Sequence, residues 1–386
     1  MDNLFFREEH SMLVDMVRDF ANTEIAPIAQ DMEKNGKIPN EIISQMAELG
    51  LMGIPVPEEY GGAGMDTVAY AAAVMELAKV DASVAITMAA HTSLGSMPIV
   101  IAGTEEQKLK YLPKLASGKV IGAFGLTEPG AGSDAGSTKT TAELDGDEYI
   151  VNGGKIFITN SSLAGILTLT TNIIENGENK GIGALIVETD NPGLKIGPKE
   201  KKMGWRASDT RQLFFENMRV PKENVLGQPT DGFQTFLKTL IGGRISVSAL
   251  SCGTAEGAFQ KALQYSTERT AFGKEITAFQ AVGFKLADMA TDIEAAKLLT
   301  FHAAWMKDQG KDVLKQAAQA KLFASEAAMR ITTEAIQIFG GYGYVKEYDV
   351  ERFFRDAKVL EIGEGTSEVQ RIIIARELVK TLSKAA

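Results

Sequence analysis

The 386-residue sequence has few of the residues that metal sites and disulfide-rich folds require. It contains one cysteine, Cys252, and three histidines, His10, His91 and His302, none of them in a zinc-ligand spacing. A disulfide framework and a structural zinc site are therefore excluded. A single cysteine is typical of a protein from a reducing compartment, so we expect a cytoplasmic location and read Cys252 as a small packing residue.

Positive charge and long apolar runs are also scarce. The net charge is −10, which argues against nucleic acid as the main partner, because phosphate binding requires a basic surface. No stretch approaches the roughly 18 consecutive apolar residues of a membrane span. The first ten residues mix acids with one arginine and have the character of neither a signal nor a transit peptide. We expect no membrane span.

Hydrophobic periodicity divides the chain into three segments. With 45% hydrophobic residues the chain can form a large core, and its length favours two or three domains. We predict an α+β chain with a helical domain at residues 1–119, an antiparallel β domain at 120–232 and a helical bundle at 233–386. The absence of βαβ alternation disfavours a Rossmann or P-loop domain.

Local signals place individual elements. A helix that ends at Asn35-Gly36 and a later one opened by a capping box of Thr104 and Gln107 are predicted for the first segment. In the second, residues 145–147 and 152–154 are predicted turns between strands. In the third, two apolar series repeat at spacings of three and four, which is typical of long packed helices. They comprise Phe279, Val282, Leu286, Met289, Ile293 and Ala296, and then Val313, Ala317, Ala320, Ala324, Ala327 and Ile331.

Two glycine-rich stretches are candidates for ligand contact. Residues 125–134 lack side chains at several positions, which lets backbone N–H groups face a ligand, although a plain surface loop is an equal alternative. Residues 337–344 place three glycines among three aromatic residues. A helix C-cap would explain one glycine, so we expect close approach of the backbone to a flat ligand or a neighbouring subunit.

Glu364 is the candidate reactive carboxylate. It lies between Gly363 and Gly365, so no neighbouring bulk hinders its side chain, although an isolated loop acid is usually just solvated. Ser367 and Gln370 are spaced as a capping box, which predicts a helix that starts near Glu368.

Six segments together resemble the acyl-CoA dehydrogenase family, in its order and over nearly the whole chain. They are residues 57–62, 126–133, 203–208, 269–273, 337–343 and 364–366. The resemblance implies an N-terminal helical domain, a central β domain and a C-terminal four-helix bundle. It also implies an FAD enzyme of fatty acid β-oxidation that desaturates an acyl-CoA between its α and β carbons and passes electrons to an electron-transferring flavoprotein. The family forms homotetramers built as a dimer of dimers.

The resemblance also assigns roles to residues. Glu364 matches the catalytic base, and Ser133, Arg244 and Gly365 match substrate contacts. The positions that match flavin contacts within one subunit are Phe124, Leu126, Thr127, Gly132, Ser133, Phe157, Ile158, Thr159, Thr366 and Glu368. Those that match contacts to the flavin of a neighbouring subunit are Arg269, Phe272, Gln280, Gln337, Gly340 and Gly341. No metal is implied.

One departure from the straight-chain members concerns the substrate. Many of them have tyrosine before the catalytic glutamate, whereas this chain has Gly363, as in the isovaleryl-CoA branch. In that branch the base lies on an earlier helix, at the position that is Gly243 here, so Glu364 has to serve. We expect a short, wide pocket for butyryl-sized or small branched acyl groups.

Two other functions remain open. An acyl-CoA oxidase would pass electrons to oxygen, although such oxidases are usually longer. A non-catalytic helical scaffold derived from the fold would be expected to lose Glu364, which is present. His91 is read either as an acyl-pocket residue or as packing, and Trp205 either as a flavin or partner contact or as simple packing.

Overall fold

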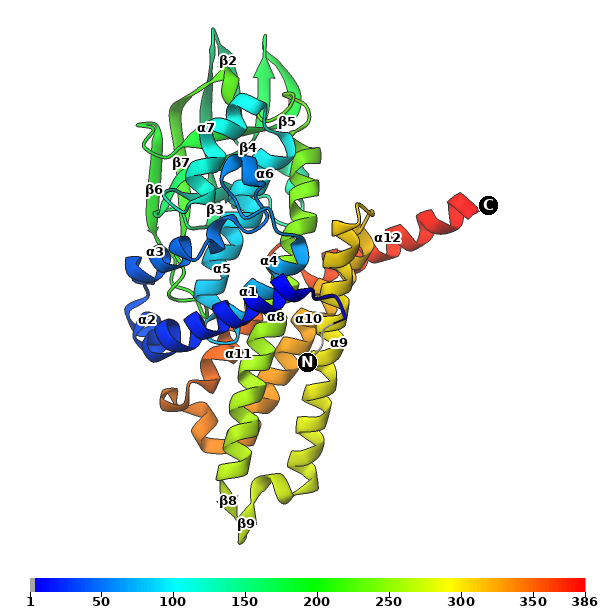
Figure 1. Ribbon diagram of the computed structural model, residues 1–386. Helices are drawn as coiled ribbons and strands as arrows, with labels where there is room; N and C mark the ends of the chain where they lie inside the picture. Colours follow the sequence, from blue (N-terminus) through cyan, green and yellow to red (C-terminus); the bar gives the residue numbers. More distant parts are fainter. Residues whose placement is uncertain (1–3, 386) are drawn as a thin grey trace.

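The computed structural model describes residues 4–385, with side chains up to residue 380. Its helices and sheet follow the three predicted segments (Figure 1). The first segment comprises α1 (Glu8–Phe20), α2 (Ala29–Asn35), α3 (Asn40–Glu48), α4 (Thr67–Ala78), α5 (Ala82–Ala89), α6 (Met97–Ala102) and α7 (Glu105–Ala116).

Capping residues fix several of these helices. Thr104 and Gln107 form the predicted reciprocal capping box of α7, and Gly36 ends α2 in the left-handed region at φ 65°. The predicted single helix before Gly36 is divided, however, by a π-helical turn and a short 3₁₀ helix at Ala26–Ile28. The reason is Pro27, which has no N–H and whose ring clashes with the preceding turn of an α-helix.

The second segment forms one seven-stranded sheet. The strands are β1 (Ile121–Gly125), β2 (Thr141–Asp145), β3 (Glu148–Thr159), β4 (Ala164–Glu175), β5 (Glu178–Glu188), β6 (Leu194–Lys199) and β7 (Thr210–Pro221). Their order is β1-β4-β2-β3-β7-β6, with β5 on β4. The predicted hairpin at 145–147 joins β2 to β3, with Gly146 in the left-handed region. The predicted antiparallel sheet requires a correction, because β4 pairs in parallel with both β1 and β2. The long connection through β2 and β3 allows a parallel return, and strand length alone does not indicate direction.

The predicted turn at 152–154 is wrong, because β3 continues through it to Thr159. Gly153 instead lies in a β-bulge with φ 138°, where the pairing of β3 with β7 shifts register. A Cβ at Gly153 would lie 2.7 Å from Thr140 Oγ1. The glycine is therefore required by close packing within the sheet rather than by a chain reversal.

The third segment is a helical bundle whose seams follow the predicted spacing. It contains α8 (Gly232–Glu268), β8 (Thr270–Ala271), β9 (Lys274–Glu275), α9 (Gln280–Asp308), α10 (Leu314–Phe339), α11 (Val350–Lys358) and α12 (Ser367–Ala385). In Figure 1 the β8–β9 hairpin lies at the end of the bundle away from the sheet, and α12 projects from the body. Cys252 lies on α8 and is buried against α9, with its Sγ 3.5 Å from Thr300 Oγ1, as expected of a small packing residue.

A buried ion network joins the three segments. The Arg352 guanidinium on α11 donates to Asp81 at the start of α5, at 2.8 Å, and to Asp349 at 2.7 Å. Asp356, one turn further along α11, accepts the backbone N–H of Trp205 from the sheet domain, at 2.6 Å. These contacts fix α11, and with it the following loop that carries Glu364.

One stretch, Ala82–Ala102, is long and apolar enough to span a membrane by length and composition alone. In the fold, 78% of an apolar 18-residue window within this stretch is buried against the rest of the chain, as in the core helix of a globular protein.

Candidate active site

Glu364 lies in a tight loop between α11 and α12. The Gly363 N–H donates to Val359 O at 2.8 Å, and the next two residues, Glu364 and Gly365, have φ values of 52° and 95°. A non-glycine residue in the left-handed region is uncommon and costs free energy, so surrounding contacts must hold Glu364 there.

The Glu364 side chain points at α8. A Cβ built on Gly243 would lie 2.8 Å from Glu364 Cδ and would overlap Oε2. The carboxylate therefore occupies the space that any side chain at 243 would need. Arg244, the next residue on α8, is 3% exposed. Within residues 4–385, neither Glu364 Oε2 nor Arg244 Nε has a hydrogen-bond partner, although both are buried.

The loop is held by Lys321, which the sequence did not single out, and by Gln370, which the sequence predicted to cap a helix. Gly365 O accepts from Lys321 Nζ at 2.8 Å and from Gln370 Nε2 at 2.9 Å, and Gln370 also reaches Glu364 O at 3.3 Å. A signal for Lys321 did exist, because it interrupts the buried alanine seam of α10.

The predicted capping box of Ser367 and Gln370 is wrong. Thr366 caps α12 instead, since its Oγ1 accepts the Val369 N–H at 3.3 Å. The Gln370 side chain is turned toward the loop carbonyls, which need a donor because the left-handed turn leaves them outside the helix.

Burial and the neighbouring charges bring the pKa of Glu364 close to neutral pH. Burial raises the pKa of Glu364 to about 7, while the nearby cations Arg244 and Lys321 oppose that rise. Burial likewise lowers the pKa of Arg244, and Glu364 opposes that change. A carboxyl group with a pKa near the working pH suits general acid–base chemistry.

Two of the segments predicted to contact a flavin within one subunit are joined by a backbone hydrogen bond. The Ile156 N–H of β3 donates to Thr127 O at 2.8 Å, which joins the loop after β1 to the end of β3. Phe157 has φ 61° and a 62% exposed side chain, so its ring is presented outward. Thr159 is half-buried beside it, and Ile158 is buried, so only the backbone of Ile158 can contact a ligand there.

The glycine-rich loop that follows β1 is open along one side. Gly132 and Ser133 are exposed, and a Cβ at Gly132 would meet no atom within 4 Å. Phe124 and Leu126 are half-buried, and the Phe124 ring stacks on Phe236 of α8 at 5.6 Å between centroids.

A buried ion pair anchors the base of that loop. Lys155 Nζ lies 2.7 Å from Glu128 Oε1, and both residues are buried. Glu128 also accepts the backbone N–H groups of Lys139 and Thr140, at 2.7 and 3.0 Å. Burial opposes ionisation, but the hydrogen bonds from Lys155, Thr138 and Thr140 lower the pKa of Glu128 to about 2, so the pair is charged at neutral pH.

The six residues predicted to reach a neighbour's flavin lie elsewhere. All of them are exposed, on or beside the β8–β9 hairpin and the end of α10: Arg269, Phe272, Gln280, Gln337, Gly340 and Gly341. The Arg269 guanidinium lies 5.6 Å from the centre of the Tyr342 ring. Gln337 follows Lys321 by more than four helical turns on α10, so it lies about 24 Å along the axis from the lysine that contacts the Glu364 loop. Within one chain, the residues predicted to contact a neighbour's flavin therefore lie apart from the Glu364 loop.

Four other positions that the sequence singled out lie as follows. Thr366 is half-buried and Glu368 exposed, both directly after the Glu364 loop. His91 is a packing residue: its Nδ1 accepts the Gly122 N–H at 2.8 Å and its Nε2 lies 3.2 Å from Met52 O. Trp205 has φ 48° and a buried indole Nε1 without a partner among the described residues.

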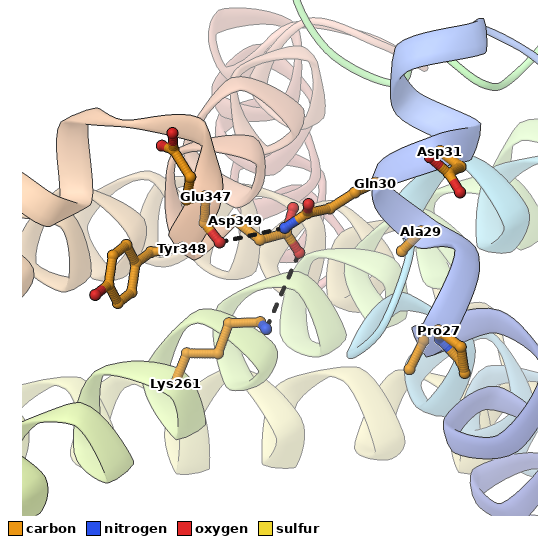
Figure 2. Close-up of a pocket in the computed structure, with 9 residues that line it drawn as sticks. Pro27, Ala29, Gln30, Asp31, Lys261, Glu347, Tyr348 and Asp349 are labelled. Carbon is orange, nitrogen blue, oxygen red and sulfur yellow. Dashed lines mark hydrogen bonds and ion pairs between the residues drawn. The ribbon is translucent and has the colours of Figure 1, made fainter.

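A separate polar cavity of about 370 Å³ lies between the N-terminal segment and the loop before α11 (Figure 2). Lys261 Nζ lies 4.0 Å from Asp349 Oδ2 there, and Gln30 donates to Glu347 O at 3.4 Å. None of the predicted site residues lines it.

The residues around β1 and β3 fit FAD. A flat ring system requires an exposed aromatic face and backbone free of side chains, and Phe157 and the open loop at Gly132 provide them. Thr127 and Ser133 add hydroxyl groups to the same loop.

Comparison with known proteins gives a consistent result over the whole chain. Family models described as acyl-CoA dehydrogenase N-terminal, middle and C-terminal domains match residues 7–119, 123–218 and 230–379. A relative in Clostridium acetobutylicum, "Acyl-CoA dehydrogenase, short-chain specific", is 47% identical over 96% of this chain and 98% of its own.

Two solved structures superpose closely. Butyryl-CoA dehydrogenase from Megasphaera elsdenii has a TM-score of 0.95 at 44% identity, over 98% of this chain and 100% of its own. A chain from work on the electron transferring flavoprotein of Acidaminococcus fermentans and flavin-based electron bifurcation also has a TM-score of 0.95, at 48% identity, over 97% and 99%.

Proposed function

The chain belongs to the acyl-CoA dehydrogenase family, and from that premise we propose that it oxidises a short-chain acyl-CoA thioester to the trans-2-enoyl-CoA. The observation that carries the proposal is the carboxylate of Glu364, held against α8 with a buried Oε2 that has no hydrogen-bond partner in the described part of the chain. FAD, when bound, accepts the hydride from the substrate β carbon and passes its electrons to an electron-transferring flavoprotein.

Glu364 acts as the base that removes the α proton. An α proton of a thioester is weakly acidic, so the base has to be held close to it and away from water. The unpartnered Oε2 is the atom available for that proton. The Arg244 guanidinium and the Lys321 ammonium beside it keep part of the population ionised at neutral pH.

The thioester carbonyl requires a hydrogen-bond donor where enolate charge develops. The Glu364 N–H is suited to this, because it donates to no other group in the described part of the chain. Glu364 precedes α12, which begins at Ser367, so this N–H is not part of the helical ladder. We propose that Gly365 and Arg244 complete the substrate contacts, with Ser133 on the loop that would meet the CoA arm.

We propose that the cofactor site spans two subunits of a tetramer, a dimer of dimers. Residues around β1, β3 and the Glu364 loop would hold the flavin of their own subunit, and the exposed group at Arg269 and Gln337 would hold a neighbour's. The separation of the two groups in one chain supports this. So do large apolar side chains left exposed on the bundle, namely Phe272, Phe284, Leu298, Ile372 and Leu378.

We further propose a cytoplasmic enzyme of fatty acid β-oxidation, with domain bounds at 119/120 and 232/233. A short substrate is supported by the butyryl-CoA dehydrogenase and the short-chain specific relative. The sequence expectation of a wide pocket at Gly363 agrees with the space there, since a Cβ would meet only Val359 O, at 3.4 Å.

A panel of acyl-CoA thioesters tests the proposal. The purified protein is expected to show flavin absorbance and to reduce an artificial electron acceptor fastest with acyl groups of about four or five carbons. Rapid reoxidation by air in the presence of substrate would indicate an oxidase instead. A colourless protein without turnover would indicate a scaffold.

A further inference from the structure

Lys321 is a buried cation that contacts the loop of the base and interacts with the charge of the base itself. It lies on α10 with a fully buried side chain, among alanines that form the seam with α8. Within residues 4–385 no carboxylate oxygen lies within 4.0 Å of its Nζ, so no close ion pair neutralises it. Burying an unpaired ammonium is costly, and such a group is retained where its charge has a use.

Among the described residues, the one side-chain hydrogen bond of Lys321 is directed at the loop of the base. Nζ donates to Gly365 O at 2.8 Å, the carbonyl that directly follows Glu364. That carbonyl belongs to the left-handed pair Glu364 and Gly365, whose backbone has no helical ladder to hold it. A charged donor at this point fixes the strained turn and therefore the direction of the carboxylate.

The charge of Lys321 also acts on the carboxylate itself. Burial lowers the pKa of Lys321 to about 8, and Glu364 is the largest charge that opposes this, so the two groups interact. The same interaction lowers the pKa of Glu364 from the value that burial alone would give. The other charges around this site are Arg244 from α8, with Arg376 near it, Glu361 before the loop and Glu368 on α12. Tyr70 from α4 faces Glu364 as well.

We propose that Lys321 is a positioning residue for the base: its hydrogen bond fixes the loop that carries Glu364, and its charge favours the carboxylate form of that side chain. This rests on the proposed function, in which Glu364 removes the α proton. Lys321 touches neither substrate nor flavin in this account and acts through Glu364.

Two variants separate the charge from the hydrogen bond. Lys321→Met removes both, and Gln370→Leu removes the other donor to the carbonyls of Glu364 and Gly365 but no charge. Both should lower kcat, by about tenfold to a hundredfold, because a displaced base costs rate. Only Lys321→Met should also move the acid limb of kcat/KM to higher pH, by about one unit or more, since loss of a nearby cation raises the pKa of a carboxyl. Lys321→Arg should return the acid limb of kcat/KM to its wild-type pH.

Lys307 provides a matched control. It is a half-buried lysine of the bundle, and its Nζ donates to Thr67 Oγ1 at 3.0 Å, with its pKa lowered by burial. Lys307→Met should leave both the rate and the acid limb unchanged. If Lys321→Met does not fold, Lys321→Gln, which retains a donor without the charge, is measured in its place.

The decisive readout is the position of the acid limb. An acid limb that stays in place in Lys321→Met while the rate falls would show that Lys321 is only structural and would overturn the proposal. The carboxyl band of Glu364 can also be titrated by infrared difference against Glu364→Gln, without turnover. If the wild-type chain oxidises no acyl-CoA, the proposed function fails, and the infrared titration still decides whether Lys321 lowers the pKa of Glu364.

Discussion

At the scale of single residues, Gly243 and Glu364 form one unit. The carboxylate fills the space beside the α8 backbone that a side chain at 243 would occupy. A chain with its base at 243 and a chain with its base at 364 are therefore alternatives, because the two side chains cannot share this volume. This agrees with the sequence reading that the absence of an acid at 243 leaves the role to Glu364.

Gly243→Ala is expected to lower turnover without destabilising the fold. The added methyl would overlap the carboxylate in its present position and displace it, whereas alanine in a helix interior is favoured over glycine by about 1 kcal/mol. Steady-state kinetics and thermal unfolding of the holoprotein measure the two effects. Gly242→Ala is the control, because its Cβ meets no atom within 4 Å, and it should keep its activity. Full activity in Gly243→Ala would place the carboxylate elsewhere.

Gly363→Tyr is expected to change substrate preference. Position 363 has no positive φ and has room for a side chain, so the backbone does not require glycine there. A ring beside the base would exclude branched acyl groups, and the ratio of branched to straight kcat/KM should fall by about tenfold or more. The ratio is the measurement, since both rates can fall if Glu364 is disturbed. A constant ratio would refute the widened pocket.

At the scale of elements, local chemistry could be predicted and non-local pairing could not. The hairpin at 145–147 and the capping box at Thr104 follow from a few adjacent residues, and both are present. The parallel pairing of β4 depends on contacts between strands far apart in sequence, which turn residues do not indicate. Glu364 could be singled out from its flanking glycines, but Lys321, distant in sequence, required the packing of α10 against the loop. The roles of these site residues stay predictions.

The contact between the π-helical segment after α5 and strand β1 is expected to make the fold sensitive to acid. Burial lowers the pKa of His91 to about 4, and the Gly122 N–H donates to its Nδ1, which fixes the neutral tautomer. The unfolded chain binds a proton at His91 at a higher pH than the folded chain does. The stability that neutral His91 contributes is therefore complete above pH 6.5 and is lost as the pH falls toward 4. Acidification to pH 5 should lower the free energy of unfolding by about 2 kcal/mol.

Denaturant unfolding at pH 8 and pH 5 checks this expectation. His91→Gln should be less stable than wild type at pH 8, yet should lose less stability on acidification. For each protein the change in unfolding free energy between pH 8 and pH 5 is measured, and the two changes are compared. A general loss of packing therefore does not affect the result. An equal loss in both proteins would mean that His91 is not the acid-sensitive group.

At the scale of the whole molecule, one chain presents two halves of the proposed cofactor site, and these halves do not meet. The first half surrounds β1, β3 and Glu364, and the second lies near the β8–β9 hairpin, where Phe272 is 95% exposed. Helix α12 projects from the body and carries further exposed apolar residues (Figure 1). An assembly that brings the second half of one chain to the first half of another would explain both features.

The holoprotein is expected to be a tetramer, with a mass in light scattering of four times the 41.5-kDa chain. Flavin bound across an interface stabilises the assembled form by mass action, so dilution should release flavin and subunits together. Arg269→Ala should weaken flavin retention, whereas Arg219→Ala, an exposed arginine of the β domain, should not. A flavin-loaded monomer at low concentration would contradict the shared site.

The most direct measurement of the central claim is turnover of a short acyl-CoA by Glu364→Gln. The substitution keeps the size of the side chain and removes its ability to take a proton, so the variant should retain FAD and bind acyl-CoA. Its turnover should fall by at least about 10²-fold, the range expected when a general base is lost. Near-normal turnover by a correctly folded, flavin-loaded Glu364→Gln would show that the base lies elsewhere and would contradict the account.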